Sequence, residues 1–172
     1  MRFFYTKKMK KIILVFIAFS TICFAQNETN ETNQINKLLN DWHKDAANTN
    51  FNNYFSVLTD DAIFIGTDAT ENWNKTQFQA FAKPYFDKGN AWNFTSLQRN
   101  IYFSNDNSLA WFDELLSTQM KICRGSGVLI KTENGWKIKH YVLSMTVPND
   151  NLDAVVKIKA PIEDAFMSTL KK

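Results

Sequence analysis

The 172-residue chain carries 20 lysines and arginines against 17 aspartates and glutamates, and 45% of its residues are hydrophobic. This length suits one ordinary domain with a sizeable core. The basic residues are scattered rather than gathered in a stripe, which argues against a nucleic-acid partner.

The first residues have the pattern of a secretory leader. A basic stretch precedes an apolar run, residues 12–24, which ends in the small residue Ala25. The run is shorter than the roughly 20 residues that span a bilayer, so a cleaved leader is favoured over an anchor. We expect residues 1–25 to be a signal peptide, with Met1 or Met9 as the start. The mature protein would then be a bacterial periplasmic or extracellular protein without a stable membrane anchor.

Removal of this leader changes the charge and the cysteine count. Residues 1–25 hold five basic residues and no acidic one, which leaves 15 against 17 and a net charge of −2. Cys23 leaves with the leader, so Cys123 has no partner for an internal disulfide. Because only His43 and His140 remain as histidines, no cluster with transition-metal ligand spacing exists, and we predict neither a metal nor a cofactor.

The chain after the leader begins with helical patterns. Residues 26–32 are polar and without periodicity, which indicates a flexible tether. Apolar residues at helical spacing predict an amphipathic helix over residues 33–48, with His43 off the apolar stripe and in solvent. A shorter helix over residues 51–58 and a short strand over residues 62–66 follow.

A loop over residues 68–73 leads into a third helix. Asn74 is the expected N-cap, and Gln77 stands in the capping-box position. Pro84 has no amide to donate and clashes with the preceding turn, so this helix should kink or end near Lys83.

The second half of the domain predicts strands. Residues 92–104 form one long strand, and residues 109–148 form three more, joined by short turns. In the last strand, lysines alternate with apolar residues, which indicates one wet face and one covered face. The covered set is Trp136, Ile138, His140, Val142 and Ser144.

The C-terminal tail, residues 150–172, is amphipathic. Its apolar spacing predicts two helical segments, with Pro161 as the interruption. Such a tail either folds across an open end of the domain or packs on a partner.

This order of elements resembles the SnoaL-like branch of the nuclear-transport-factor-two-like superfamily. The likeness is carried by TDDAIFIGTDATENW (59–73), LAWFDELL (109–116), RGSGVLIKTENGW (124–136) and KIKHYVLSMTVPND (137–150). It implies an α+β, cystatin-like fold over residues 33–149. In that fold three helices from the N-terminal half pack on the concave face of a cone-shaped, curved antiparallel sheet. An interior pocket and a homodimer through the outer sheet face are also implied. The scaffold serves isomerases, cyclases, hydratases, hydrolases and binding domains, so it implies no particular reaction.

Strand alternation places candidate charged residues in the pocket. If the set that includes His140 faces inward, Arg124 on the neighbouring strand lies beside it and needs a partner. Adjacent residues of a strand face opposite ways, so either Asp113 or Glu114 must point inward. We favour Asp113, with Trp111 beside it as a wall of the pocket.

Two interpretations of Asp113, Arg124 and His140 stay open. The carboxylate could abstract a proton next to a carbonyl while His140 or Arg124 stabilises the enolate. Alternatively, the charges form a buried ion pair that holds the strands together. Candidate ligand-contacting residues are Trp42, Phe64, Trp73, Tyr85, Trp111, Glu114 and Ser144.

Two further features have a structural and a functional interpretation. Glu71 lies in the loop near the same end of the domain, either at the pocket or as a solvated charge. Gly125 and Gly127 lie inside a strand with no helix after them, which indicates a bulge or close backbone approach rather than a phosphate loop.

The sequence thus predicts an exported pocket protein that binds a small, largely apolar molecule as a homodimer. One alternative is an acid/base isomerase, cyclase or hydratase that acts in the same pocket. Another is a non-catalytic dimerisation or interaction domain that uses the outer sheet face and the tail.

Overall fold

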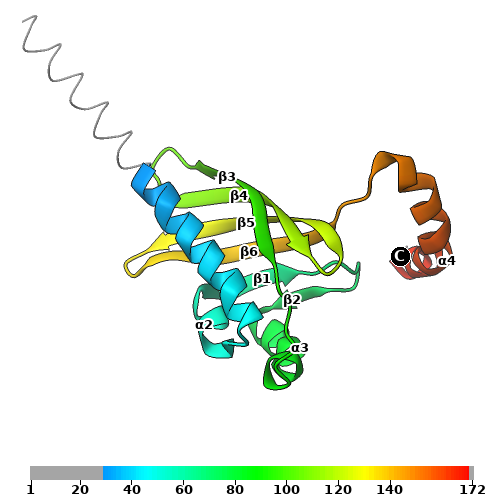
Figure 1. The fold of residues 1–172 in the computed structure, drawn as a ribbon, viewed down its shortest axis with the longest axis horizontal. Coiled ribbons are helices and arrows are strands. Elements are labelled where there is room, and N and C mark those ends of the chain that lie inside the picture. Colours follow the sequence, from blue (N-terminus) through cyan, green and yellow to red (C-terminus); the bar gives the residue numbers. More distant parts are fainter. Residues whose placement is uncertain (1–28, 171–172) are drawn as a thin grey trace, which may run out of the picture.

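The computed structural model describes residues 29–170, at whose centre lies one curved six-stranded sheet (Figure 1). The N-terminal helix is described over residues 29–47. The later elements are α2 (Phe51–Ser56), β1 (Leu58–Ile65), β2 (Asn72–Asn74), α3 (Lys75–Asp87), β3 (Thr95–Phe103), β4 (Leu109–Thr118), β5 (Lys121–Thr132), β6 (Gly135–Met145), a 3₁₀ turn (Asn149–Asn151) and α4 (Leu152–Leu170). The signal peptide predicted at residues 1–25 lies outside the described residues.

The sheet has the strand order β2-β1-β6-β5-β4-β3. Its neighbours are antiparallel except β1 and β6, which run parallel. The predicted α+β fold is confirmed, with the refinement that the sheet contains this one parallel pair. The parallel pair joins the N-terminal hairpin to the long C-terminal strands, so residues far apart in sequence share one interior.

The N-terminal helix crosses the concave face of the sheet (Figure 1). Its apolar stripe is buried at Ile35, Leu39, Trp42 and Ala46, as the helical spacing predicted. α2 and α3 close the end of the sheet formed by β1 and β2 (Figure 1). Aromatic side chains from α3 and the neighbouring strands gather at this end and line a pocket between the helix and the sheet.

The start of α3 confirms the predicted capping box, and of the two outcomes predicted near Lys83, a kink or an end of the helix, the end does not occur there. The Asn74 side chain accepts from the Gln77 amide at 2.9 Å, and the Gln77 side chain accepts from the Asn74 amide at 3.0 Å. The helix continues past Lys83 to Asp87. Pro84 lies in the last turn, where it removes a single amide bond close to solvent, so it does not end the helix.

A bulge interrupts β6. Ile138 pairs with Leu129 and His140 pairs with Val128, so Lys139 is an extra residue opposite β5. The bulge reverses which residues point inward.

The buried residues of β6 are accordingly Trp136 and Ile138 before the bulge, and Tyr141 and Leu143 after it. The prediction of one uninterrupted inward set is correct only as far as Ile138.

α4 is one continuous helix that projects from the domain (Figure 1). The interruption predicted at Pro161 is wrong. Pro161 has no amide to donate to the carbonyl of Lys157, four residues earlier. Both residues are exposed, so the helix tolerates the missing bond. Within residues 152–170 no side chain is buried. Among the described residues, no helix combines the length and apolar character that crossing a membrane would need.

Candidate functional site

Asp113, Arg124 and His140 lie on the outer face of the sheet rather than in its interior. The buried residues of β4 share the parity of Glu114, and those of β5 share the parity of Cys123. The bulge turns His140 outward as well. The placement of these three residues in the pocket is therefore wrong. For His140 and Arg124 it failed because the alternation was phased on β6 without the bulge, and Asp113 was favoured only as the partner of Arg124.

Each of these three residues has a different cross-strand neighbour, and that of His140 on β5 is Val128. Asp113 lies opposite Asn100, whose side-chain amide donates to it at 3.2 Å. Arg124 lies opposite Ser144, and both side chains are exposed.

Trp111 also lies on the outer face, where it is 47% exposed and stacks on Tyr102 with ring centroids 5.9 Å apart. Neither Trp111 nor Ser144 contributes to the interior, which corrects their prediction as pocket residues.

Glu114 is the carboxylate that points inward, and it is completely buried. His43 Nε2 lies 2.9 Å from Glu114 Oε1, and the Tyr141 hydroxyl donates to the same oxygen at 3.1 Å. Arg99 donates to Oε2 through Nε at 2.9 Å and through Nη2 at 2.7 Å. Four bonds therefore satisfy this carboxylate.

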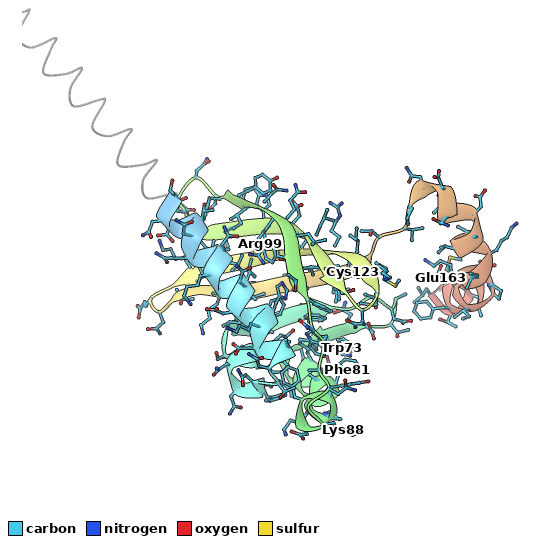
Figure 2. All side chains as sticks on the ribbon, in the orientation of Figure 1. Trp73, Phe81, Lys88, Arg99, Cys123 and Glu163 are labelled. Atoms are coloured by element: carbon cyan, nitrogen blue, oxygen red, sulfur yellow. The ribbon has the colours of Figure 1, made fainter. Side chains whose placement is uncertain are left out.

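Arg99 extends the same network to the N-terminal helix. Its Nη1 donates to the Asn36 side chain at 3.1 Å and to the Asn40 side chain at 3.0 Å. Figure 2 shows Arg99 at the concave side of the sheet, where that helix crosses. The prediction that His43 lies in solvent is wrong, because His43 is 4% exposed and faces Glu114.

The pKa values of this network follow from burial and charge. Burial alone would raise the pKa of Glu114, but the bond from His43 and the charges of His43 and Arg99 lower it below its ordinary value. Burial, and then the charge of Glu114, raise the pKa of Tyr141 well above its usual range. At neutral pH the carboxylate is thus ionised and the tyrosine is a neutral donor, which is the pattern of an ion pair that joins the helix to the sheet.

Gly125 makes room for this network on β5. A Cβ atom there would lie 2.2 Å from the Tyr141 hydroxyl and 3.0 Å from Glu114 Cγ. The close backbone approach predicted for the β5 glycines is confirmed at Gly127, where a Cβ atom would lie 2.6 Å from the His140 carbonyl oxygen, whereas the neighbours of Gly125 are side chains.

The aromatic pocket opens at the end of the sheet next to α3. Its volume is about 190 Å³. Its lining residues come from the β1–β2 hairpin, α3, the segment before β3, the β4–β5 turn and β6: Phe64, Gly66, Thr67, Glu71, Trp73, Phe78, Phe81, Trp92, Phe94, Gln119, Met120 and Leu143. The lining is thus mainly rings, with few polar groups.

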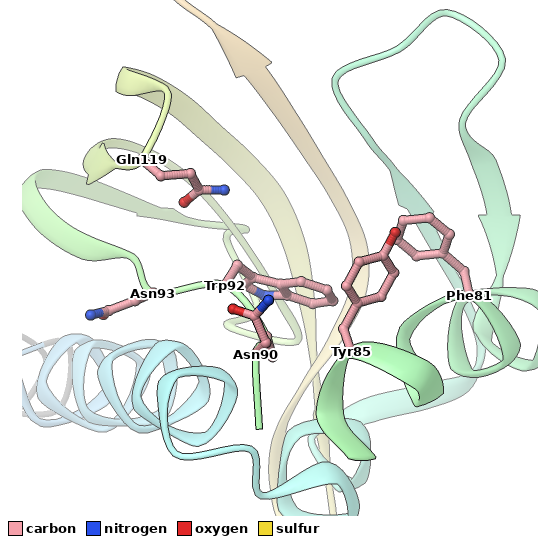
Figure 3. A pocket seen from close by; sticks show the side chains of 7 residues that line it. Phe81, Tyr85, Asn90, Trp92, Asn93 and Gln119 are labelled. Atoms are coloured by element: carbon pink, nitrogen blue, oxygen red, sulfur yellow. The ribbon is translucent and has the colours of Figure 1, made fainter. Parts of the chain in front are cut away.

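An outer hollow of about 580 Å³ adjoins the aromatic pocket (Figure 3). The two share Phe81, Trp92 and Gln119. Tyr85 and the Asn90–Asn93 segment complete the wall of the outer hollow. Figure 3 shows the Tyr85 and Phe81 rings together on α3, with Trp92 facing them from the segment before β3.

The predicted ligand-contacting residues therefore fall into those that line a pocket and those that belong to the core. Phe64 and Trp73 line the aromatic pocket, and Tyr85 lines the outer hollow. Trp42 is core instead, 1% exposed and stacked on Tyr54. Trp92, Phe94 and Gln119 were missed, although the Ala91–Phe94 run directly after a glycine turn is a signal for a ring-bearing loop.

A third hollow lies beside the buried network. It has a volume of about 350 Å³, and its wall includes His43, Lys44 and Phe94. Within residues 29–170, no three His, Cys, Asp or Glu side chains come together so as to hold a metal ion.

The model of the SnoaL-like domain matches residues 35–148. The chain belongs to the SnoaL-like family. Comparison with curated protein sequences finds no match.

Solved structures share the fold of this SnoaL-like domain. An NTF2-like protein of unknown function from Pseudomonas putida KT2440 superposes with a TM-score of 0.60 at 13% identity, over 72% of this chain and 92% of that chain. A provisionally assigned dehydratase of the NTF2-like family from Streptomyces avermitilis gives 0.60 at 10% identity, over 70% and 99%. The association domain of CaMKII from C. elegans gives 0.57 at 17% identity, over 69% and 98%. At these identities the likeness shows the fold alone.

Proposed function

We propose that this SnoaL-like domain binds a small, largely apolar molecule in the aromatic pocket. The lining of that pocket carries the proposal: the side chains of six aromatic residues surround about 190 Å³, with Thr67, Glu71 and Gln119 as polar side chains. Concave sites with apolar walls and a few polar groups are typical of small-molecule binding. The small volume favours a compact ligand group, with the rest of the molecule in the outer hollow.

Binding of a small apolar probe tests this proposal. Toluene, titrated into the full chain and followed by NMR, should shift the indole signals of Trp73 and Trp92 and leave that of Trp111 unchanged. Trp73→Ala should weaken toluene binding roughly tenfold or more, as loss of an aromatic anchor does. Trp111→Ala on the outer face is the matched control and should bind as the wild type does. Saturating toluene without any indole shift would contradict the proposal.

A second candidate is acid/base catalysis, now centred on His43. The observation that favours it is the pairing of His43 Nε2 with the buried Glu114, at the wall of the third hollow. A carboxylate that orients a histidine is the arrangement general-base catalysis uses. Deuterium exchange at the α-carbon of a small ketone such as cyclohexanone tests it. The exchange should be lost in His43→Asn and kept in His140→Asn; equal rates with and without protein would rule it out.

We also propose a homodimer through the outer sheet face and export by the N-terminal leader. The exposed apolar side chains of that face support the first: Tyr102, Leu109, Trp111 and Ile122. The association domain among the structural neighbours is consistent with assembly on this scaffold. The basic and apolar pattern of residues 1–25 supports export. Fractionation of expressing bacteria, with mass analysis of the N-terminus, tests it: intact cytoplasmic chain would contradict export.

A further inference from the structure

Glu71 is the single formally charged side chain among the described residues that line the aromatic pocket. The outer hollow adds tyrosine, asparagine and alanine, which are neutral. Across both spaces the described lining residues therefore carry one negative charge and no positive charge. A ligand with an anionic group would meet repulsion here, whereas a cation would meet attraction.

The Glu71 carboxylate is held at the pocket wall. The Asp68 amide donates to Glu71 Oε2 at 3.1 Å. A Cβ atom at Gly66 would lie 2.1 Å from the same oxygen, so the glycine leaves the space that the carboxylate occupies. Within residues 29–170 no salt bridge reaches Glu71. The charge is thus positioned and without a cationic partner in this part of the chain.

The rings beside Glu71 lie close to parallel. Trp73 stacks on Phe81 at 4.4 Å with 25° between the ring planes, and Figure 2 shows the two side chains together. The angle between Trp73 and Phe78 is 9°, and that between Phe78 and Trp92 is 17°. The face of an aromatic ring carries negative electrostatic potential, and tryptophan attracts a cation most strongly. Stacking covers the faces that these rings turn to one another, so a cation is attracted to a ring face that stacking leaves open toward the pocket. Such a face and the Glu71 carboxylate favour the same sign of ligand charge.

We infer that the ligand is a small organic cation, an amine or a quaternary ammonium compound. This inference rests on the proposed pocket function. The cationic group enters the aromatic pocket beside Glu71 and the tryptophans, and the apolar or polar remainder lies in the outer hollow. Contact with a cation compensates the half-buried carboxylate, which a neutral hydrocarbon cannot do.

A pair of probes with the same shape and different charge tests the inference. Choline has a quaternary nitrogen where 3,3-dimethylbutan-1-ol has a neutral carbon. Isothermal titration of each into the full chain should show choline binding roughly 2- to 30-fold more tightly, the range expected for a cation on aromatic faces. The NMR signals of Trp73 and Trp92 report whether both probes occupy the pocket.

Three variants locate the source of this preference. Glu71→Gln should weaken choline binding roughly two- to fivefold and leave the alcohol unchanged, because the amide keeps the acceptor for Asp68 but not the charge. Gly66→Ala should act in the same direction, since it displaces the carboxylate without removing it. Glu133→Gln makes the same charge change in the exposed β5–β6 turn and should leave both affinities unchanged.

The outcomes separate the two proposals. Equal or tighter binding of the alcohol overturns the cation inference and leaves the pocket function standing. A choline preference that survives Glu71→Gln also overturns it, since the carboxylate then does not select the ligand. Failure of choline, the alcohol and toluene alike overturns both proposals.

Discussion

Glu114 and Asp113 are adjacent carboxylates with opposite environments. Glu114 is completely buried and bonded to Arg99, His43 and Tyr141, whereas Asp113 meets Asn100 at the outer face. The partners of Glu114 come from three other elements, so no local pattern in β4 distinguishes the two acids. What could be predicted was that one of the pair must face inward. Which one depended on contacts distant in sequence.

Replacement of Glu114 by glutamine should strongly destabilise the fold. The change leaves the buried charge of Arg99 without its counter-ion, and breaking a buried pair in this way costs about 3–5 kcal/mol. Urea unfolding followed by circular dichroism measures the difference. Glu133→Gln, in the exposed turn, should unfold within about 0.5 kcal/mol of the wild type. A loss at Glu114 no larger than that of this control would show that the network does not hold the helix to the sheet.

The depressed pKa of Glu114 also predicts a dependence of stability on pH. Its folded-state pKa lies below the ordinary value of 4.5, so the contribution to stability is fully present above pH 4.5 and is lost as the pH falls through the folded-state pKa. Thermal unfolding between pH 7 and pH 3 should therefore show a steeper loss for the wild type than for Glu114→Gln. Parallel curves would contradict this. Other acids with lowered pKa values are present in both proteins and cancel in the comparison.

At the scale of elements, most of the helices and strands could be predicted from periodicity and caps. The capping box at Asn74 and Gln77 is local chemistry, and the sequence is sufficient for it. The bulge at Lys139 is not local, because it depends on how β6 pairs with β5. That one extra residue reversed the faces of the last strand and carried the error to Arg124 and His140.

Gly125→Ala should destabilise the fold more than an alanine substitution on the outer face of β5 does. The added methyl group would meet the Tyr141 hydroxyl at 2.2 Å in a packed interior, and overpacking of this kind costs about 1–3 kcal/mol. Ser126→Ala, on the opposite face of the same strand, is the matched control for β propensity. Urea midpoints of the two variants make the comparison. Equal midpoints would mean that the tyrosine moves aside without loss.

At the scale of the whole molecule, the domain leaves two apolar surfaces uncovered within the described residues. One is the outer sheet face, where Trp111 is 47% exposed. The other is α4, in which Ile158 is 77% and Ile162 is 75% exposed. Large exposed apolar patches of this kind are typical of surfaces through which proteins associate. The sequence predicted an amphipathic tail, but not that it would project from the domain as one helix.

Substitution of Trp111 by arginine tests the proposed homodimer. An unpaired charge in the centre of an apolar interface is costly to bury, so the dissociation constant should rise at least roughly tenfold. Light scattering coupled to gel filtration measures the mass at several concentrations. Lys121→Glu, an exposed charge change in the same strand pair, serves as the control. A wild type that is monomeric at high concentration would refute the dimer directly.

The bulge in β6 also shapes how the chain tolerates change. Along a regular strand, sensitive and tolerant positions alternate without interruption. Here the positions that are sensitive to substitution should be even-numbered up to Ile138 and odd-numbered from Tyr141 onward. The alternation of inward and outward residues changes at Lys139. Deletion of Lys139 from this chain would remove the extra residue and exchange the inward and outward faces of one part of β6 relative to the other.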